Sequence, residues 1–183
     1  MRVIAGTARS MPLKAPKGID TRPTTDRIKE TLFNILQNDV PGSVFVDLFS
    51  GSGAIGIEAI SRGAKKVYFV ENAKEAITCI EQNLSFTKFT DKAILYKTDA
   101  VAAVTALTEP IDIIFMDPPY ETEAEKRVLS ALVHQKAVTN DTLIIVEASL
   151  KTAFDYVSDI GFEVIREKCY KTNKHVFIQR QAR

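Results

Sequence analysis

Two patterns of hydrophobic and polar positions take turns along this chain: short apolar runs, and segments in which apolar residues recur every three or four positions. Short apolar runs, bounded by glycine, proline or polar residues, predict strands at residues 44–49, 67–71, 93–97, 111–117 and 143–147. Between them, apolar residues recur every three or four positions and predict helices at 54–62, 73–86, 101–107, 122–135 and, more briefly, 151–158. Strands that alternate with helices form right-handed βαβ units, so we predict an α/β fold on a mostly parallel sheet.

The two ends of the chain depart from this alternation. Two β-rich runs at 162–170 and 175–180 enclose a polar turn, which predicts a hairpin with at least one antiparallel strand. Near the start, residues 2–5 and 11–14 predict a short hairpin, and a helix begins at Thr24 or Thr25. We therefore expect one domain over residues 1–183, with an N-terminal extension at 1–43 and a core at 44–183.

Charge is segregated along the chain although its total is close to zero. The 183 residues carry 24 Lys and Arg against 23 Asp and Glu, a net +1. Residues 1–29 hold seven basic and two acidic side chains, a net +5, which leaves −4 for the remainder. The total therefore does not exclude a nucleic-acid partner, because the basic segment fits phosphates and the acidic remainder fits a cationic ligand. A hydrophobic content of 45% excludes intrinsic disorder.

The cysteines, the histidines and the length of the apolar runs argue against a disulfide-bonded, metal-binding or membrane protein. Cys79 and Cys169 stand too far apart for a CxxC pair, so we expect neither disulfides nor a zinc cluster, and a reducing cytoplasmic location. His134 and His175 lack the spacing of metal ligands; we expect no metal site and interpret both as surface or interface residues. No apolar run approaches the ~20 residues that span a bilayer, so no membrane association is expected.

A glycine-rich loop follows the first predicted strand of the core. Gly51, Gly53 and Gly56 follow the GxGxxG pattern, with Asp47 late in the strand and Glu71 twenty residues after Gly51. This spacing also fits the fingerprint of nicotinamide dinucleotide enzymes, in which the loop receives a pyrophosphate. A carboxylate at position 47 repels such an anion and suits a cationic ligand such as S-adenosylmethionine. We favour S-adenosylmethionine and keep a hydride-transfer enzyme as an alternative.

The strand at 111–117 ends in the most informative stretch of the chain, Asp117-Pro118-Pro119-Tyr120. Ligands of open α/β sheets bind beyond the carboxyl ends of the strands, so this stretch faces the same crevice as the glycine loop. Pro118 holds Asp117 extended, and the Asp117 carboxylate and the Pro118 carbonyl offer two acceptors to a planar amine. The ring of Tyr120 offers a surface on which a base can stack.

Three stretches together resemble a known family. They are residues 21–34 with an Arg-Pro-Thr-Thr-Asp-Arg block, residues 47–59 with the glycine loop, and residues 117–120. Over essentially its whole length the chain resembles the RsmD family, bacterial methyltransferases that modify guanine N2 in small-subunit ribosomal RNA. One departure concerns the N-terminal RNA contact: the family often has Arg-Gly near Arg9 and Ser10, where serine replaces the glycine here.

The resemblance implies a class I S-adenosylmethionine-dependent methyltransferase fold, Rossmann-like and doubly wound, with a mostly parallel seven-stranded sheet of strand order 3-2-1-4-5-7-6. It implies that Glu71 binds the ribose and Asp99 the adenine, within a cofactor set of Asp47, Ser50, Gly51, Gly53, Glu71, Asn72, Asp99 and Ala100. It implies that the guanine meets the catalytic residues Asp117, Pro118 and Tyr120. The residues expected at the RNA are Arg9, Arg22, Thr24 and Arg27.

The implied reaction is methyl transfer from S-adenosylmethionine to the N2 amine of a specific guanine in small-subunit ribosomal RNA. The Asp-Pro-Pro-Tyr stretch also serves adenine-N6 methylation of DNA or RNA, which stays as the alternative, although no separate domain exists to read a duplex. A catalytically silent RNA-binding factor is a further class. We expect a monomer whose substrate is RNA within a small-subunit ribonucleoprotein particle, because a chain of net charge +1 binds naked RNA weakly.

Overall fold

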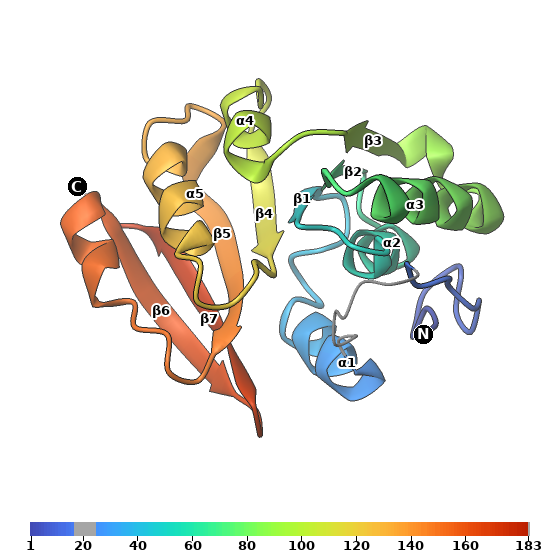
Figure 1. Ribbon diagram of the computed structural model, residues 1–183, viewed down its shortest axis with the longest axis horizontal. Helices are drawn as coiled ribbons and strands as arrows, with labels where there is room; N and C mark the ends of the chain where they lie inside the picture. The colour runs from blue at the N-terminus through green and yellow to red at the C-terminus, as the bar shows by residue number, and fades with distance from the viewer. Residues whose placement is uncertain (17–24, 183) are drawn as a thin grey trace.

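The computed structural model describes residues 1–16 and 25–182 and shows a central sheet between two groups of helices (Figure 1). The strands are β1 (Val44–Leu48), β2 (Lys66–Val70), β3 (Ala93–Tyr96), β4 (Ile111–Met116), β5 (Val138–Ser149), β6 (Phe162–Cys169) and β7 (Asn173–Arg180). The α-helices are α1 (Asp26–Ile35), α2 (Ala54–Ser61), α3 (Lys74–Thr87), α4 (Ala100–Thr105) and α5 (Ala124–Leu132). Two 3-10 turns, η1 (Thr90–Lys92) and η2 (Asp155–Ile160), complete the fold.

The sheet has the order β3-β2-β1-β4-β5-β7-β6, which confirms the strand order that the family resemblance implied. Strands β1 to β5 pair in parallel, and β7 pairs antiparallel with β5 and with β6. The order reverses between β1 and β4, where the chain leaves the two strands in opposite directions. A crevice forms at such a switch point beyond the carboxyl ends of the strands. Both motifs from the sequence follow these two strands.

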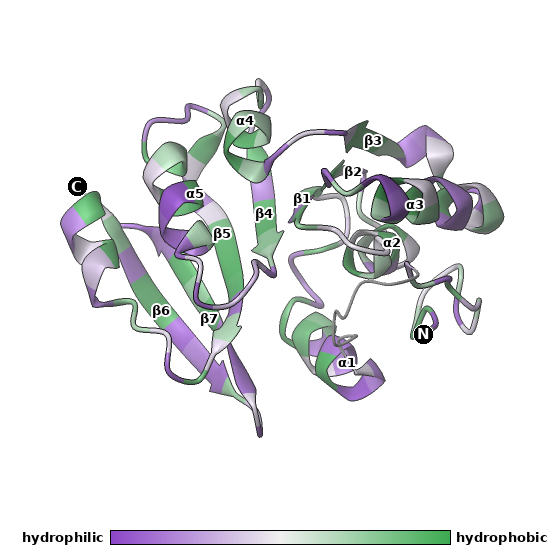
Figure 2. Ribbon diagram, viewed as in Figure 1, coloured by the Kyte–Doolittle hydropathy of each residue, from purple (hydrophilic) through white to green (hydrophobic). Residues whose placement is uncertain are grey.

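Two hydrophobic cores cover the two faces of the sheet. One packs α4, α5 and η2 against alternate strand residues, and the other packs α1, α2, α3 and the N-terminal segment against the residues between them. The central strands β4 and β5 are accordingly rich in hydrophobic residues in Figure 2. This burial on both faces is why the strands read as continuous apolar runs in the sequence. None of the described helices is long and apolar enough to cross a membrane.

The N-terminal hairpin is confirmed in a reduced form. Its arms make one β-bridge, between Arg2 and Pro12, and backbone bonds join the two arms on either side of it. Ser10 in its turn has φ of 69°, a left-handed conformation that glycine adopts more readily. The hairpin packs against the end of α2, where the backbone N–H of Thr7 and that of Ala8 donate to Ser61.

Two sequence predictions differ from the structure at the C-terminal half of the sheet. Strand β5 has twelve residues, whereas the apolar run covered 143–147 alone. Residues 139–142 are polar, but Val138 before them pairs with Ile111 and the Thr142 hydroxyl donates to the Ile111 carbonyl, which extends the strand beyond the apolar run. The helix expected at 151–158 is the 3-10 turn η2 instead. For β5, a hydrogen bond to a strand distant in the sequence decides what the local pattern left undetermined.

Gly56 on α2 lies directly against Phe69 of β2. A Cβ added at Gly56 would stand 2.3 Å from Cε1 of that fully buried ring. Replacing Gly56 by alanine therefore forces the helix away from the sheet, and we expect a loss of about 1–3 kcal/mol in the free energy of unfolding, measured by urea denaturation.

The double variant Gly56→Ala with Phe69→Leu provides the control for this prediction. Leucine removes the ring that the new methyl group meets, so the alanine should cost much less in that background. If the two substitutions simply add, the close approach is not what requires the glycine.

Candidate active site

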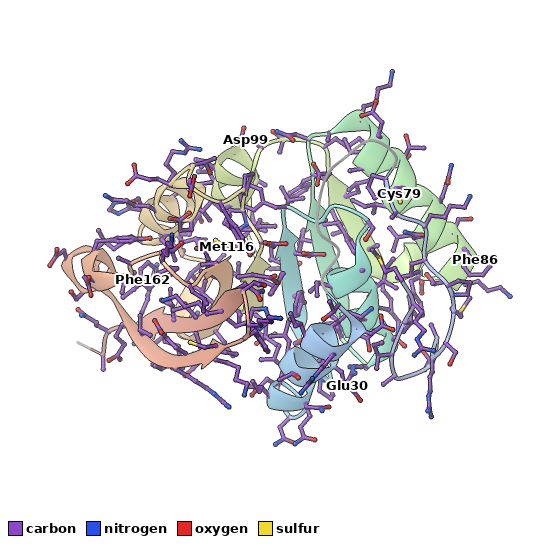
Figure 3. The ribbon with its side chains drawn as sticks, turned by 60° about the horizontal axis from the view of Figure 1, so that its bottom comes forward. Glu30, Cys79, Phe86, Asp99, Met116 and Phe162 are labelled. Atoms are coloured by element: carbon purple, nitrogen blue, oxygen red, sulfur yellow. The ribbon has the colours of Figure 1, made fainter. Side chains whose placement is uncertain are left out.

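The two motifs meet at the carboxyl edge of β1 and β4. Asp47 lies on β1, 1% exposed, beside Phe115 of β4 in the sheet register, and Asp117 follows Met116 at the end of β4. Figure 3 shows Met116 near the middle of the molecule, with Asp99 at the beginning of α4. The charges of Glu71, which follows β2, and of Asp117 both act on Asp47. The structure thus brings Asp47, Glu71 and Asp117 to the same edge of the sheet.

The backbone N–H groups of the glycine loop are already bound by the protein itself. Gly51 donates to Oε2 of Glu71 (2.9 Å), Gly56 donates to Oδ2 of Asp47 (3.0 Å), and Gly53 donates to the carbonyl of Ser50 (2.8 Å). A phosphate cradle offers such groups free to an anion. Here two of the three hold carboxylates, so a pyrophosphate would meet negative charge. This geometry disfavours the nicotinamide dinucleotide alternative.

Ser50 fixes the loop to the neighbouring strand. Its hydroxyl donates to the carbonyl of Asp47 (2.6 Å) and accepts from the N–H of Val70 (2.9 Å), while its own N–H donates to the Val70 carbonyl (3.0 Å). These bonds join the ends of β1 and β2. The predicted cofactor residue Ser50 is therefore buried structural support within the site.

Two acidic residues after β2 and β3 accept hydrogen bonds from backbone N–H groups that follow them, and one of the two, Asp99, caps a helix. The Oε1 atom of Glu71 accepts from the N–H groups of Asn72 and Ala73 at the start of α3. Asp99 caps α4 by accepting from Ala102 (3.0 Å). Asn72 and Asp99 are exposed, and Ala100 is buried. The predicted cofactor residues Asn72, Asp99 and Ala100 thus line the same edge of the sheet, and the roles assigned to them stay predictions.

Carboxyl groups gather at this edge of the sheet. Burial raises the pKa of Asp47 well above its usual range; the Gly56 N–H opposes this shift, and the charges of Glu71 and Asp117 add to it. Carboxylates that raise the proton affinity of one another favour a positively charged ligand at the same place. The residues present therefore fit the sulfonium and ammonium groups of S-adenosylmethionine.

The loop after β4 carries the predicted base-binding residues. Pro118 is buried, and Tyr120 has 46% of its surface exposed. Beyond it, Glu121 and Glu123 both have positive φ, 62° and 53°, and the Thr122 hydroxyl donates to the Pro119 carbonyl. Strained non-glycine residues gather at ligand sites more than elsewhere. The loop thus presents an exposed ring beside the acidic crevice on a sharply turned backbone.

The sequence analysis missed a polar cluster beside Asp117 and misassigned one of its members. His175 was expected at the surface and is fully buried on β7, where its Nε2 lies 3.1 Å from Oε2 of Glu147. Tyr170 and Asn173 complete the cluster. No local pattern in the sequence marks it, because its members come from β5, β7 and the hairpin turn and meet only through strand pairing.

Two of the four residues expected at the RNA lie within the described part of the chain. Arg9 is exposed in the N-terminal hairpin, whose turn packs against Ser61 at the end of α2, whereas the glycine loop lies at the beginning of that helix. Arg27 is exposed on α1. Arg22 and Thr24 lie outside the described residues. The structure thus does not place Arg9 beside Asp117, and the RNA contacts of all four residues stay predictions.

Comparison with known proteins gives a consistent result. Residues 1–179 match the family model described as Conserved hypothetical protein 95. YlbH of Bacillus subtilis, whose name assigns it provisionally to the rRNA methyltransferases, is 38% identical over 150 residues, 80% of this chain and 82% of that protein. "Ribosomal RNA small subunit methyltransferase D" of Escherichia coli is 30% identical, covering 100% of this chain and 91% of its own. The solved structure of Escherichia coli yhhF matches with a TM-score of 0.85 at 29% identity, covering 100% and 99% of the two chains.

Proposed function

We propose that this chain methylates ribosomal RNA, because it belongs to the family described as Conserved hypothetical protein 95. This is the RsmD family that its sequence resembles. The proposed reaction transfers a methyl group from S-adenosylmethionine to the exocyclic N2 amine of a guanine in the small-subunit RNA. The observation that carries the proposal is the crevice itself: Asp47, Glu71 and Asp117 converge at the switch point, beside the buried Pro118 and the exposed ring of Tyr120.

The choice of cofactor is supported by the acidic residues at this edge of the sheet and by the glycine loop, whose N–H groups are bonded to Glu71 and Asp47. S-adenosylmethionine supplies an activated methyl group when it is bound. Asp47 and the loop at Gly51 and Gly53 would border its amino-acid part, Glu71 would accept bonds from the ribose, and Asp99 would face the adenine. Glu71 already accepts three backbone N–H groups, yet its two oxygens offer about four acceptor sites, so a ribose hydroxyl can still bind it.

Asp117 and Pro118 would act on the amine. An aromatic amine is a weak nucleophile because its lone pair is delocalised into the ring. An acceptor on each N–H favours the pyramidal nitrogen and stabilises the positive charge that develops during attack. The carboxylate of Asp117 and the carbonyl of Pro118 are the two acceptors, and holding the amine in line with the methyl group supplies much of the remaining acceleration.

Binding and transfer assays test this function in two steps. Calorimetric titration should show binding of S-adenosylmethionine and none of NADH. Incubation with tritiated cofactor and small-subunit particles from a strain lacking this protein, followed by nucleoside mass spectrometry, should then yield N2-methylguanosine. N6-methyladenosine as the product would support the adenine alternative. NADH binding without methyl transfer would support the oxidoreductase instead.

Tyr120→Ala removes the ring on which the base is proposed to stack. Stacking on an aromatic side chain contributes about 1–3 kcal/mol, so we expect KM for the RNA particle to rise by roughly 5–150-fold with little change in cofactor affinity. Tyr120→Phe is the matched control, because it keeps the ring and should remain within about twofold of the wild type. A KM that is unchanged in Tyr120→Ala would exclude stacking on this residue.

A further inference from the structure

A row of polar side chains continues from Asp117 across β5 and β7. Side chains two positions apart share a face of a strand. Phe115, Ile145 and Phe177 all face the core beneath α1, α2 and α3. Glu147 and His175 stand two positions from Ile145 and Phe177, toward the carboxyl edge, and so share their face, while Asp117 directly follows the end of β4. Glu147 and His175 are direct partners in the β5–β7 register, and the His175 ring packs edge-on against Phe115 at 6.0 Å.

Glu147 is held by two hydrogen-bond donors although it is only 5% exposed. Asn173 donates to its Oε1 (2.7 Å), and its Oε2 lies 3.1 Å from Nε2 of His175. A carboxylate only accepts, so the ring proton of His175 lies on Nε2, and in the neutral ring Nδ1 accepts from the Tyr170 hydroxyl (3.1 Å). His175 and Asn173 thus fix the position of the Glu147 side chain between β5 and β7.

The amide of Asn173 is oriented toward this carboxylate at a cost. Its Oδ1 is buried and has no hydrogen-bond partner among the described residues, while its Nδ2 bonds to Glu147. An unmatched buried acceptor is unfavourable, whereas a hydrogen bond to a charged group is about twice as strong as one between neutral groups. The bond from Nδ2 of Asn173 to Glu147 therefore fixes which way this amide is turned.

The charge of Glu147 acts on Asp117. Burial and then the negative charge of Glu147 raise the pKa of Asp117 to about 8. The charge of Asp117 acts in turn on Asp47 of β1, and His175 of β7 is paired with Glu147. Lys174 points to the opposite face, where its Nζ lies over the ring of Phe154. An ordinary aspartate is a poor base at neutral pH, and a base with its pKa near the working pH is far more effective.

We propose that Glu147 is a positioning residue for methyl transfer: held by His175 and Asn173, it keeps a negative charge beside Asp117 and so makes Asp117 the base that takes the amine proton. This proposal rests on the proposed function and adds the residues that act on its base, Asp117. Glu147 acts on Asp117 through its charge and does not touch the reacting atoms.

Methyl transfer forms a C–N bond at the amine while the C–S bond of the donor breaks with its electron pair left on sulfur. The amine nitrogen then carries a positive charge and an excess proton. The Asp117 carboxylate takes that proton, which leaves a neutral methylated amine and a neutral thioether, and Asp117 returns the proton to water after the product leaves.

Titration of the ligand-free protein tests the coupling without any assay of activity. Carbon-13 NMR of the carboxyl groups, with the Asp117 signal assigned by its loss in Asp117→Asn, gives the pKa of Asp117 directly. In the wild type it should lie near 8. In Glu147→Gln, which keeps the shape and removes the charge, it should fall by at least about one unit. In Glu147→Asp, which keeps the charge, it should stay near the wild-type value.

Two outcomes of the titration overturn the proposal. One is a pKa of Asp117 that does not move in Glu147→Gln or that falls equally in Glu147→Asp. The other outcome is a wild-type pKa of Asp117 below about 5, which would make it an ordinary aspartate. This measurement needs no variant, so it tests the proposal even if Glu147→Gln does not fold. Glu163→Gln, at an exposed position of β6, is the matched control and should leave the titration unchanged.

Methylation of RNA particles as a function of pH separates this proposal from the proposed function. In Glu147→Gln the acid limb of the kcat profile should move to lower pH, because Asp117 ionises earlier, and the rate above it should fall several-fold because the base is weaker. A role for Glu147 in folding alone would lower the rate equally at every pH. A wild type that methylates, with an unshifted profile in Glu147→Gln, overturns this proposal alone; a wild type without methyl transfer overturns both.

Discussion

Replacing Asp117 by alanine is expected to reduce methyl transfer to RNA by about 10³-fold or more while the cofactor still binds. Asp117 stands at the end of β4, beyond the buried strand, and no backbone bond of the strand depends on its side chain. Its carboxylate would both accept from the amine and take the proton. Incorporation of tritiated methyl into RNA particles measures the rate, and calorimetry with S-adenosylmethionine measures the binding.

Asp91→Ala provides the control for this loss. Asp91 is an exposed aspartate in η1, between α3 and β3, so its removal should leave transfer near the wild-type rate. Methyl transfer by Asp117→Ala within about tenfold of the wild type would contradict the catalytic assignment. Loss of cofactor binding together with transfer would instead assign Asp117 to the cofactor.

Replacing Glu58 by alanine is expected to cost about 3–5 kcal/mol of stability, the second large effect. Glu58 on α2 is fully buried and accepts from the N–H groups of Ile4 and Ala5 at 2.8 and 3.0 Å. It also pairs with Arg62 (2.8 Å) and with Nζ of the buried Lys29 on α1 (3.4 Å). Its loss leaves two N–H groups unmatched and Lys29 without the carboxylate that counteracts the lowering of its pKa by burial. Urea denaturation measures the change.

Glu30→Ala on α1 is the control for Glu58. Glu30 is exposed, and Figure 3 shows its place on the same helix as Lys29. A surface substitution of this kind should change the free energy of unfolding by no more than about 0.5 kcal/mol. Equal losses in the two variants would contradict the role of Glu58 as the residue that joins the N-terminal segment and α1 to α2.

The alternation of strands and helices was predictable because both faces of the sheet are covered. Burial on both sides makes each central strand an apolar run, and each covering helix shows its core-facing stripe. The chemistry-bearing loops were predictable for a similar reason: Gly51, Gly53 and Asp117 follow strand ends, where parallel sheets bind ligands. The strand order came from the family resemblance rather than from periodicity.

What the sequence did not reveal depends on contacts between distant segments. The glycine pattern is the same whether its N–H groups are free or bound, and only the structure shows Glu71 and Asp47 holding them. His175 looks like a solitary surface histidine until β7 pairs with β5 and buries it on Glu147. Likewise, the sequence does not show that the hairpin turn carrying Arg9 packs at the end of α2, through the bond from the Thr7 N–H to the Ser61 carbonyl.

Mass spectrometry of small-subunit ribosomal RNA from cells that lack this protein tests the central claim most directly. Digestion to nucleosides and mapped oligonucleotides reports every methylated base in one measurement. The proposed function predicts the loss of a single N2-methylguanosine, restored by the wild-type gene and not by Asp117→Ala. An unchanged set of modifications, or the loss of a methyladenosine instead, would contradict it.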